Sequence, residues 1–90
     1  MIELVKVVKV KPRSSHVLHV VFSNGDEGDA DFSWVLEKDW PMTEPLKDPA
    51  FFRKAFISFG VPTWPNGFDV DAINLHREMA EKGRLKKIAA

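Results

Sequence analysis

The chain has 90 residues, of which 44% are hydrophobic and 29% charged, a composition typical of a folded chain with a single core. Thirteen basic and 13 acidic residues give a formal net charge of zero, so no overall field favours nucleic acid or an anionic membrane. The absence of cysteine excludes disulfides, thiolate metal sites and thiol nucleophiles, and it leads us to expect a cytoplasmic location.

The N-terminal residues form an interrupted apolar run that is typical of a strand. Valine alternates with lysine over residues 4–11, which predicts a β-strand with one face in water. Glu3, Lys6 and Lys9 break the run, so we expect neither a signal peptide nor a membrane span here. Pro12 is expected to end the strand, because proline has no backbone N–H to donate.

Two further strands are predicted to follow. Residues 16–22 alternate so that every second apolar side chain shares one face. Asn24-Gly25 tolerates the positive φ of a tight primed turn, so residues 27–32 should return antiparallel. Ala30 and Phe32 would then face the core. The first third of the chain therefore predicts a three-stranded antiparallel meander.

The middle of the chain predicts short helical pieces and a second hairpin. Ser33 can cap a short helical segment, and residues 39–45 are expected to form a loop. Asp48-Pro49 predicts a helix start, because aspartate accepts backbone N–H groups and proline at the first position loses no hydrogen bond. Residues 56–59 and 61–64 read as two short strands joined by a tight turn at glycine.

A C-terminal amphipathic helix is predicted after Asp71, which should cap it, and Gly83 should end it. We expect a single α+β domain over residues 1–83 and a basic flexible tail over residues 84–90. In this fold the meander and the two short strands share one mixed sheet, and the middle and C-terminal helices pack on it. The helix face predicted to be apolar comprises Ala72, Leu75, His76, Met79 and Ala80.

Four short motifs resemble the bacterial domain of unknown function family 2442, and the resemblance spans roughly residues 5–75. It implies a small mixed-sheet α+β domain, often encoded beside a second small protein in a regulatory or antitoxin-like pairing. It brings no catalytic residues, and the chain is too short to add a helix-turn-helix domain. The motifs are Phe22-Ser23-Asn24-Gly25, Asp31-Phe32, Pro45 to Pro49 with Phe51 and Phe52, and Trp64 to Asp69.

Candidate sites for chemistry each have a structural alternative. His16, His19 and His76 are too few and too scattered for a predicted metal site, which needs about three or four converging donors. Asp69 and Asp71 could act as an acid–base pair, but turn and cap roles explain them better. No phosphate loop or nucleophile elbow is present, so no cofactor is predicted. An acidic ribbon can be explained in two ways: its charges keep other strands from pairing with an exposed strand edge, or its carboxylates bind a cation. It comprises Asp26, Glu27, Asp29 and Asp31.

The aromatic residues suggest binding rather than catalysis. Three Trp and seven Phe exceed what a domain of this size readily hides, and tryptophan is enriched at contact hot spots. We therefore predict a protein-interaction module that uses the loop 40–45 and the turn 64–71 to bind another small protein or a second copy. For Trp64 an ordinary core position is the competing interpretation. The predicted contact residues are Trp40, Trp64, Asn66, Phe68 and Asp69.

Two other classes of function stay open. One is a small enzyme that uses Asp69 with Asn66, which should show a concave pocket with carboxylates in unusual environments. The other is a weak nucleic-acid binder that uses the basic stripe 6–13 with residues 84–87, although the neutral total charge disfavours it.

Overall fold

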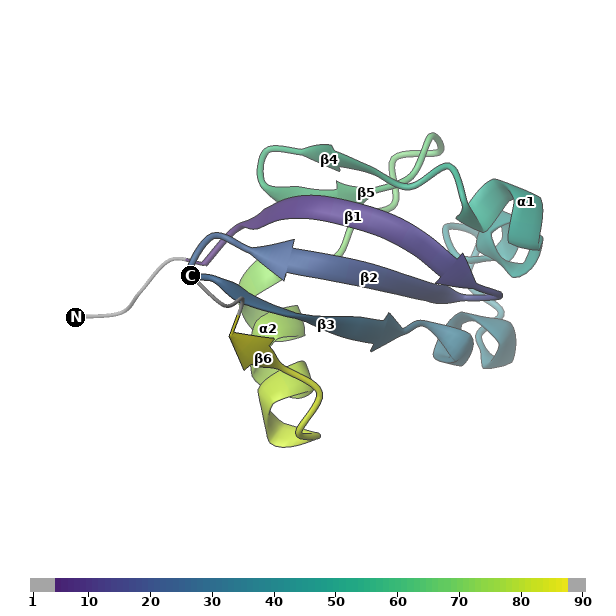
Figure 1. Cartoon of the computed structure of the whole chain (residues 1–90). Coiled ribbons are helices and arrows are strands. Elements are labelled where there is room, and N and C mark those ends of the chain that lie inside the picture. Colours follow the sequence, from purple (N-terminus) through teal and green to yellow (C-terminus); the bar gives the residue numbers. More distant parts are fainter. Residues whose placement is uncertain (1–4, 88–90) are drawn as a thin grey trace.

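Four antiparallel strands form the main sheet of the computed structural model, which describes residues 5–87 (Figure 1). These strands are β1 (Val7–Ser14), β2 (Val17–Phe22), β3 (Asp26–Asp31) and β6 (Lys86–Lys87), in the order β1-β2-β3-β6. The α+β class and the three-stranded meander are confirmed. The sheet gains β6 from a segment that we had placed in the tail: Lys86 and Lys87 pair with Glu27 and Asp26 of β3. Residues 88–90 of that tail lie outside the described residues.

Strand β1 runs past Pro12, contrary to the prediction that proline would end it. Pro12 pairs with Leu18 of β2, and the register shifts between Pro12 and Ser14. Because β1 is an edge strand, a residue without an N–H costs it no hydrogen bond on the open side.

The turn between β2 and β3 differs from the prediction in type. Three residues connect β2 to β3; Gly25 donates its N–H to Phe22 O at 3.0 Å and has φ +91°, whereas φ of Asn24 is not positive. This is a three-residue loop closed by a left-handed glycine and not a primed turn. A positive φ at both central positions occurs instead at Phe59 (52°) and Gly60 (75°), between the next two strands.

The second hairpin forms its own sheet, so the predicted single mixed sheet is wrong. Strands β4 (Phe56–Ser58) and β5 (Val61–Thr63) pair only with each other as strands, and one backbone bond, from Val7 N to Gly60 O at 2.8 Å, ties the hairpin to β1. The other side of β5 is occupied by the following turn, because Val70 N donates to Pro62 O at 3.1 Å. Strand β5 therefore has no open edge with which to join the main sheet.

The middle of the chain is less helical than predicted. It contains two 3-10 helices, η1 (Ser33–Glu37) and η2 (Glu44–Lys47), and the single turn α1 (Pro49–Phe52). The predicted Asp48 cap is confirmed, since its carboxylate accepts from Ala50 N at 3.0 Å. Ser33 is not a cap; its own N–H donates to Asp31 Oδ1 at 2.9 Å.

Helix α2 (Ala72–Glu81) packs on the main sheet as predicted. Asp71 caps its N-terminus by accepting from Asn74 N at 3.1 Å. At the C-terminus Gly83 has φ +67°, and Arg84 N donates to Met79 O at 2.9 Å, which is the pattern of a Schellman motif. After this motif the chain reverses direction, and β6 pairs with β3. Within residues 5–87 no helix has the length and apolarity to cross a membrane.

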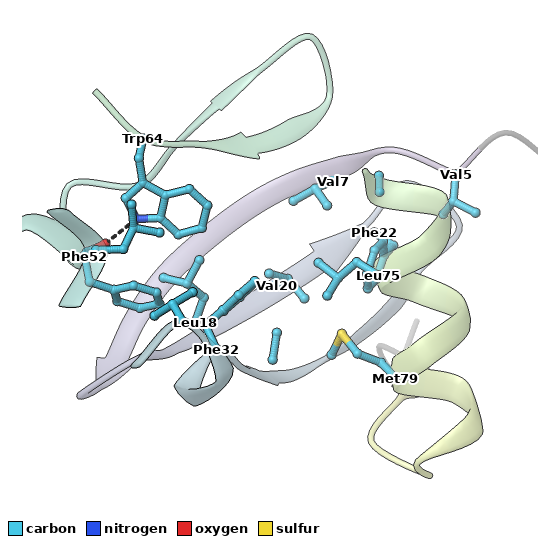
Figure 2. Packing of buried hydrophobic residues seen from close by; sticks show 14 residues of the cluster. Val5, Val7, Leu18, Val20, Phe22, Phe32, Phe52, Trp64, Leu75 and Met79 are labelled. Carbon is cyan, nitrogen blue, oxygen red and sulfur yellow. Dashed lines mark hydrogen bonds between the residues drawn. The ribbon is translucent and has the colours of Figure 1, made fainter. Parts of the chain in front are cut away.

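The core lies between the main sheet, α2 and α1 (Figure 2). At one end Phe32, Phe52 and Trp64 pack ring against ring, with centroids 5.5–5.8 Å apart. At the other end Leu75 and Met79 of α2 lie against the sheet. The predicted core orientation of Ala30 and Phe32 is confirmed, because both side chains are buried.

Candidate functional site

The two bends predicted as contact elements lie against each other. Asn66, in the turn after β5, donates from Nδ2 to Met42 O at 2.9 Å across 24 positions of sequence. Its Oδ1 accepts from Phe68 N at 3.3 Å, so the same amide also shapes its own turn. Gly67 faces the Met42 side chain, whose Cε would lie 3.9 Å from a Cβ built at Gly67. The loop 40–45 and the turn 64–71 therefore form one surface.

A series of rings connects this surface to the core. Trp40 is 53% exposed and meets Trp34 edge to face, with centroids 6.5 Å apart. Trp34 lies 6.3 Å from Phe68, and Phe68 lies 5.7 Å from Trp64. Outside these rings, Lys38 Nζ stands 5.0 Å from the Trp40 ring centroid, a cation–π contact. We call Trp34, Trp40, Met42, Asn66 and Phe68 the aromatic surface.

Trp64 does not belong to this surface, which corrects the prediction that it contacts a partner. Its side chain has no exposed area, and its indole Nε1 donates to Phe52 O at 2.9 Å. A tryptophan packed between three other rings and with its one donor satisfied is a core residue. Two members of the surface were not named as contact residues from the sequence: Met42, which is 44% exposed and lies in the predicted loop 40–45, and the half-buried Trp34.

Asp69 is exposed at the end of the turn, where it forms an isolated bridge with Thr63. The enzyme alternative required Asp69 to act with Asn66, but Asn66 is engaged by Met42 and Phe68. Among the described residues no hydrogen bond joins Asp69 to Asn66. Asp71 caps α2 and so has the structural role that we preferred for it.

The three histidines lie in separate places. His16 is buried, with Nε2 2.7 Å from Leu46 O and Nδ1 2.8 Å from Ser15 Oγ. His19 lies on the outer sheet face, with Nδ1 2.8 Å from Asp29 Oδ1. Within residues 5–87 no group of three or more His, Cys, Asp or Glu side chains is arranged to hold a metal ion.

The basic segments of the nucleic-acid alternative are also separated. Strands β1 and β6 lie at opposite edges of the main sheet, with the acidic strand β3 between them. Some of their charges are paired with that strand: Arg13 Nε lies 3.5 Å from Asp29 Oδ1, and Lys87 Nζ lies 2.8 Å from Asp26 Oδ1. The structure therefore offers no continuous basic stripe formed by both segments.

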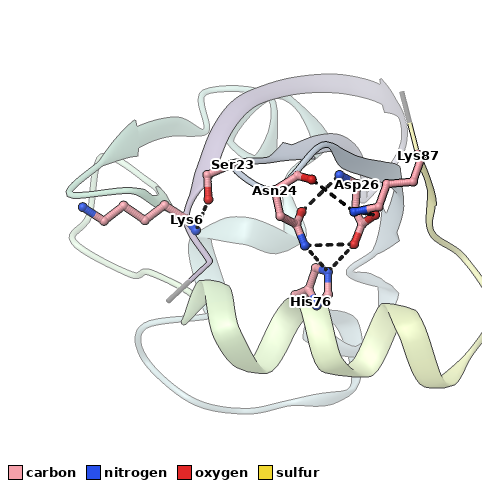
Figure 3. A network of polar contacts seen from close by, with 6 residues as sticks. All are labelled: Lys6, Ser23, Asn24, Asp26, His76 and Lys87. Atoms are coloured by element: carbon pink, nitrogen blue, oxygen red, sulfur yellow. Dashed lines mark hydrogen bonds and ion pairs between the residues drawn. The ribbon is translucent and has the colours of Figure 1, made fainter. Parts of the chain in front are cut away.

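An unpredicted polar cluster joins α2 to the β2–β3 turn (Figure 3). Asp26 accepts hydrogen bonds from Lys87 Nζ and from Asn24 Nδ2 at 3.1 Å, and its Oδ2 lies 2.6 Å from His76 Nε2. The pKa of Asp26 is lowered from 3.8 to about 2, mainly by the hydrogen bond from Lys87 and next by the one to His76. Because Asp26 and His76 are 50 positions apart, no local pattern could reveal the pair.

We expect this cluster to make stability depend on acid pH. The pKa of Asp26 is lower in the folded state than in the unfolded state. The stability that its ionised carboxylate contributes is therefore present above about pH 4 and is lost as the pH falls toward about 2. The free energy of unfolding should drop by on the order of 1–2 kcal/mol over that window because of Asp26 alone. Urea unfolding of the wild type and of Asp26→Asn measures it. The variant should be less stable at pH 7 and lose less on acidification; equal losses would contradict the assignment.

Comparison with known families identifies the chain. The family model described as protein of unknown function (DUF2442) matches residues 7–80. The chain belongs to this family. The resemblance inferred from the four motifs is thereby confirmed, and the match includes β1 to β5, most of α2 and the whole aromatic surface. Neither a curated protein nor a solved structure matches the chain significantly.

Proposed function

We propose that this member of the family is a small protein-binding module that docks a partner on its aromatic surface. One observation carries the proposal: two bends far apart in sequence are joined by the Asn66–Met42 hydrogen bond, and together they present Trp40 to solvent. A partly exposed indole on a braced support is the kind of side chain that contributes most to protein contacts.

The surroundings of Trp40 favour a protein partner over a catalytic role. Trp34 packs against Trp40 and is itself packed against Phe68, so little freedom is lost when a partner packs against the Trp40 ring. Met42 adds an adaptable apolar side chain next to it. The partner that we favour is another small protein, in a regulatory or antitoxin-like pair; a second copy of the chain is the alternative.

Replacing Trp40 by alanine should weaken this binding strongly without unfolding the protein. Loss of a central tryptophan should weaken the complex by about 30-fold or more. The measurement is the affinity of the purified protein for the products of adjacent genes, by calorimetry, with light scattering to detect a second copy. Ile73→Ala is the matched control, since Ile73 is 37% exposed on α2, outside the aromatic surface. Unchanged affinity for Trp40→Ala, or no complex with either partner, would refute the proposal.

A further inference from the structure

A cleft of about 360 Å³ opens between the end of β3, η1 and α2. Its apolar lining includes Phe32 from the sheet end and Leu75 and Met79 from α2, with the half-buried Trp34 at one side. The volume is at the small end of the range for ligand sites, which are typically roughly 300–1,000 Å³. The cleft thus suits a compact molecule with an apolar body.

The charged groups around the cleft favour an anion. Lys38, Lys82 and Arg84 line it, against the two acids Asp31 and Glu78. Both acids already have partners: Asp31 accepts the Ser33 N–H, and Glu78 Oε1 lies 4.0 Å from Lys82 Nζ. The pKa of Asp31 is lowered mainly by the hydrogen bond from the Ser33 N–H, and the positive charges of Arg84 and Lys82 lower it further. Asp31 is therefore ionised at neutral pH, and three cations against two acids leave the lining with one excess positive charge.

Arg84 is the cation best placed to receive a ligand. Within residues 5–87 its guanidinium forms no ion pair, whereas Lys82 faces Glu78 and Lys38 lies over the Trp40 ring. Its backbone is held on both sides: Arg84 N donates to Met79 O, and Arg84 O packs so closely on Gly28 that a Cβ there would lie 2.0 Å away. A planar guanidinium on a fixed backbone matches the two oxygens of a carboxylate.

We propose that this cleft binds a small amphipathic carboxylate, with its apolar body against the half-buried Trp34 and Val70 and its carboxylate on the Arg84 guanidinium. The apolar lining disfavours inorganic phosphate, which would lose its hydration without gaining comparable partners. The site goes beyond the protein-binding proposal, because it assigns a ligand of another class to another part of the molecule. Trp34 is shared by the cleft and the aromatic surface.

Titration of the full chain with phenylacetate, its neutral isostere phenylacetamide and inorganic phosphate tests the proposal by ¹H–¹⁵N NMR. A ligand of this size should bind with a dissociation constant on the order of 1 mM and shift the Trp34 indole signal. Phenylacetate should bind about tenfold tighter than phenylacetamide, and phosphate should not compete.

Variants identify the anchoring residue. Arg84→Gln should weaken phenylacetate about tenfold, and Lys38→Gln should weaken it by a smaller factor. Arg53→Gln is the matched control, because Arg53 is exposed and does not line the cleft, so this variant should leave binding unchanged. Equal affinities for phenylacetate and phenylacetamide, no shift at Trp34, or full binding by Arg84→Gln would overturn the assignment, whatever the outcome for Trp40→Ala.

Discussion

Replacing Trp64 by alanine should lower the free energy of unfolding by about 3–5 kcal/mol. The side chain has no exposed area and packs against the rings of Phe32, Phe52 and Phe68 at centroid distances of 5.5–5.7 Å. Alanine would leave a cavity among these rings. It would also remove the indole N–H that donates to Phe52 O, leaving that carbonyl without this partner. Such a loss is a large share of the roughly 5–15 kcal/mol that stabilises a typical domain.

Trp40→Ala is the matched control, because it removes the same side chain from an exposed site. Trp40 is 53% exposed, so its truncation should change the unfolding free energy by less than about 1 kcal/mol. Urea unfolding of the two variants, followed by circular dichroism, measures the difference. A similar loss in both would mean that the indoles do not have the separate core and surface roles assigned here.

Replacing Gly28 by alanine should destabilise the protein by on the order of 3 kcal/mol, at the upper end of the usual cost of overpacking. A Cβ at this position would lie 2.0 Å from Arg84 O and 3.2 Å from Met79 Cε. The first clash is with backbone, so no side-chain rotation relieves it. Either β3 or the segment that leads into β6 must move. The expected structural result is loss of the pairing between β3 and β6, in which Lys87 lies opposite Asp26.

Gly25→Ala separates this clash from an ordinary glycine effect. Gly25 has φ +91°, and a Cβ built there meets no neighbouring atom within 4 Å, so its substitution costs backbone strain alone, about 1–2 kcal/mol. Urea unfolding gives the two losses, and amide hydrogen exchange reports on β6. A cost for Gly28→Ala no larger than for Gly25→Ala, with β6 still protected, would contradict the packing described here.

The aromatic surface and the cleft are joined through Trp34. Its ring supports Trp40 on one side and lines the cleft on the other. The polar cluster of Asp26, His76 and Lys87 holds α2 and β6 against the β2–β3 turn. Strand β6 begins two residues after Arg84. The polar cluster therefore helps to hold in place the segment that carries Arg84 of the cleft.

Local sequence features determined much of the secondary structure. The alternation in β2 and β3, the caps at Asp48 and Asp71 and the stop at Gly83 were all predicted, because each depends on a few neighbouring residues. The family resemblance was also visible in the sequence, because each of its motifs is a short run of neighbouring residues. Of the predicted contact residues, Trp40, Asn66 and Phe68 lie on the aromatic surface, whereas the contact between the two bends that brings them together could not be seen in the sequence.

Tertiary structure alone decided the rest. Pro12 stays in a strand because β1 is at an edge, and Trp64 is buried because the turn folds its indole toward Phe52. The strands form two separate sheets, and not the predicted mixed sheet, because the turn 64–71 occupies the open side of β5. The cleft and the Asp26–His76 pair join segments about 50 positions apart. Periodicity and capping report each residue's neighbours along the chain, whereas burial and pairing depend on which distant segment packs against it.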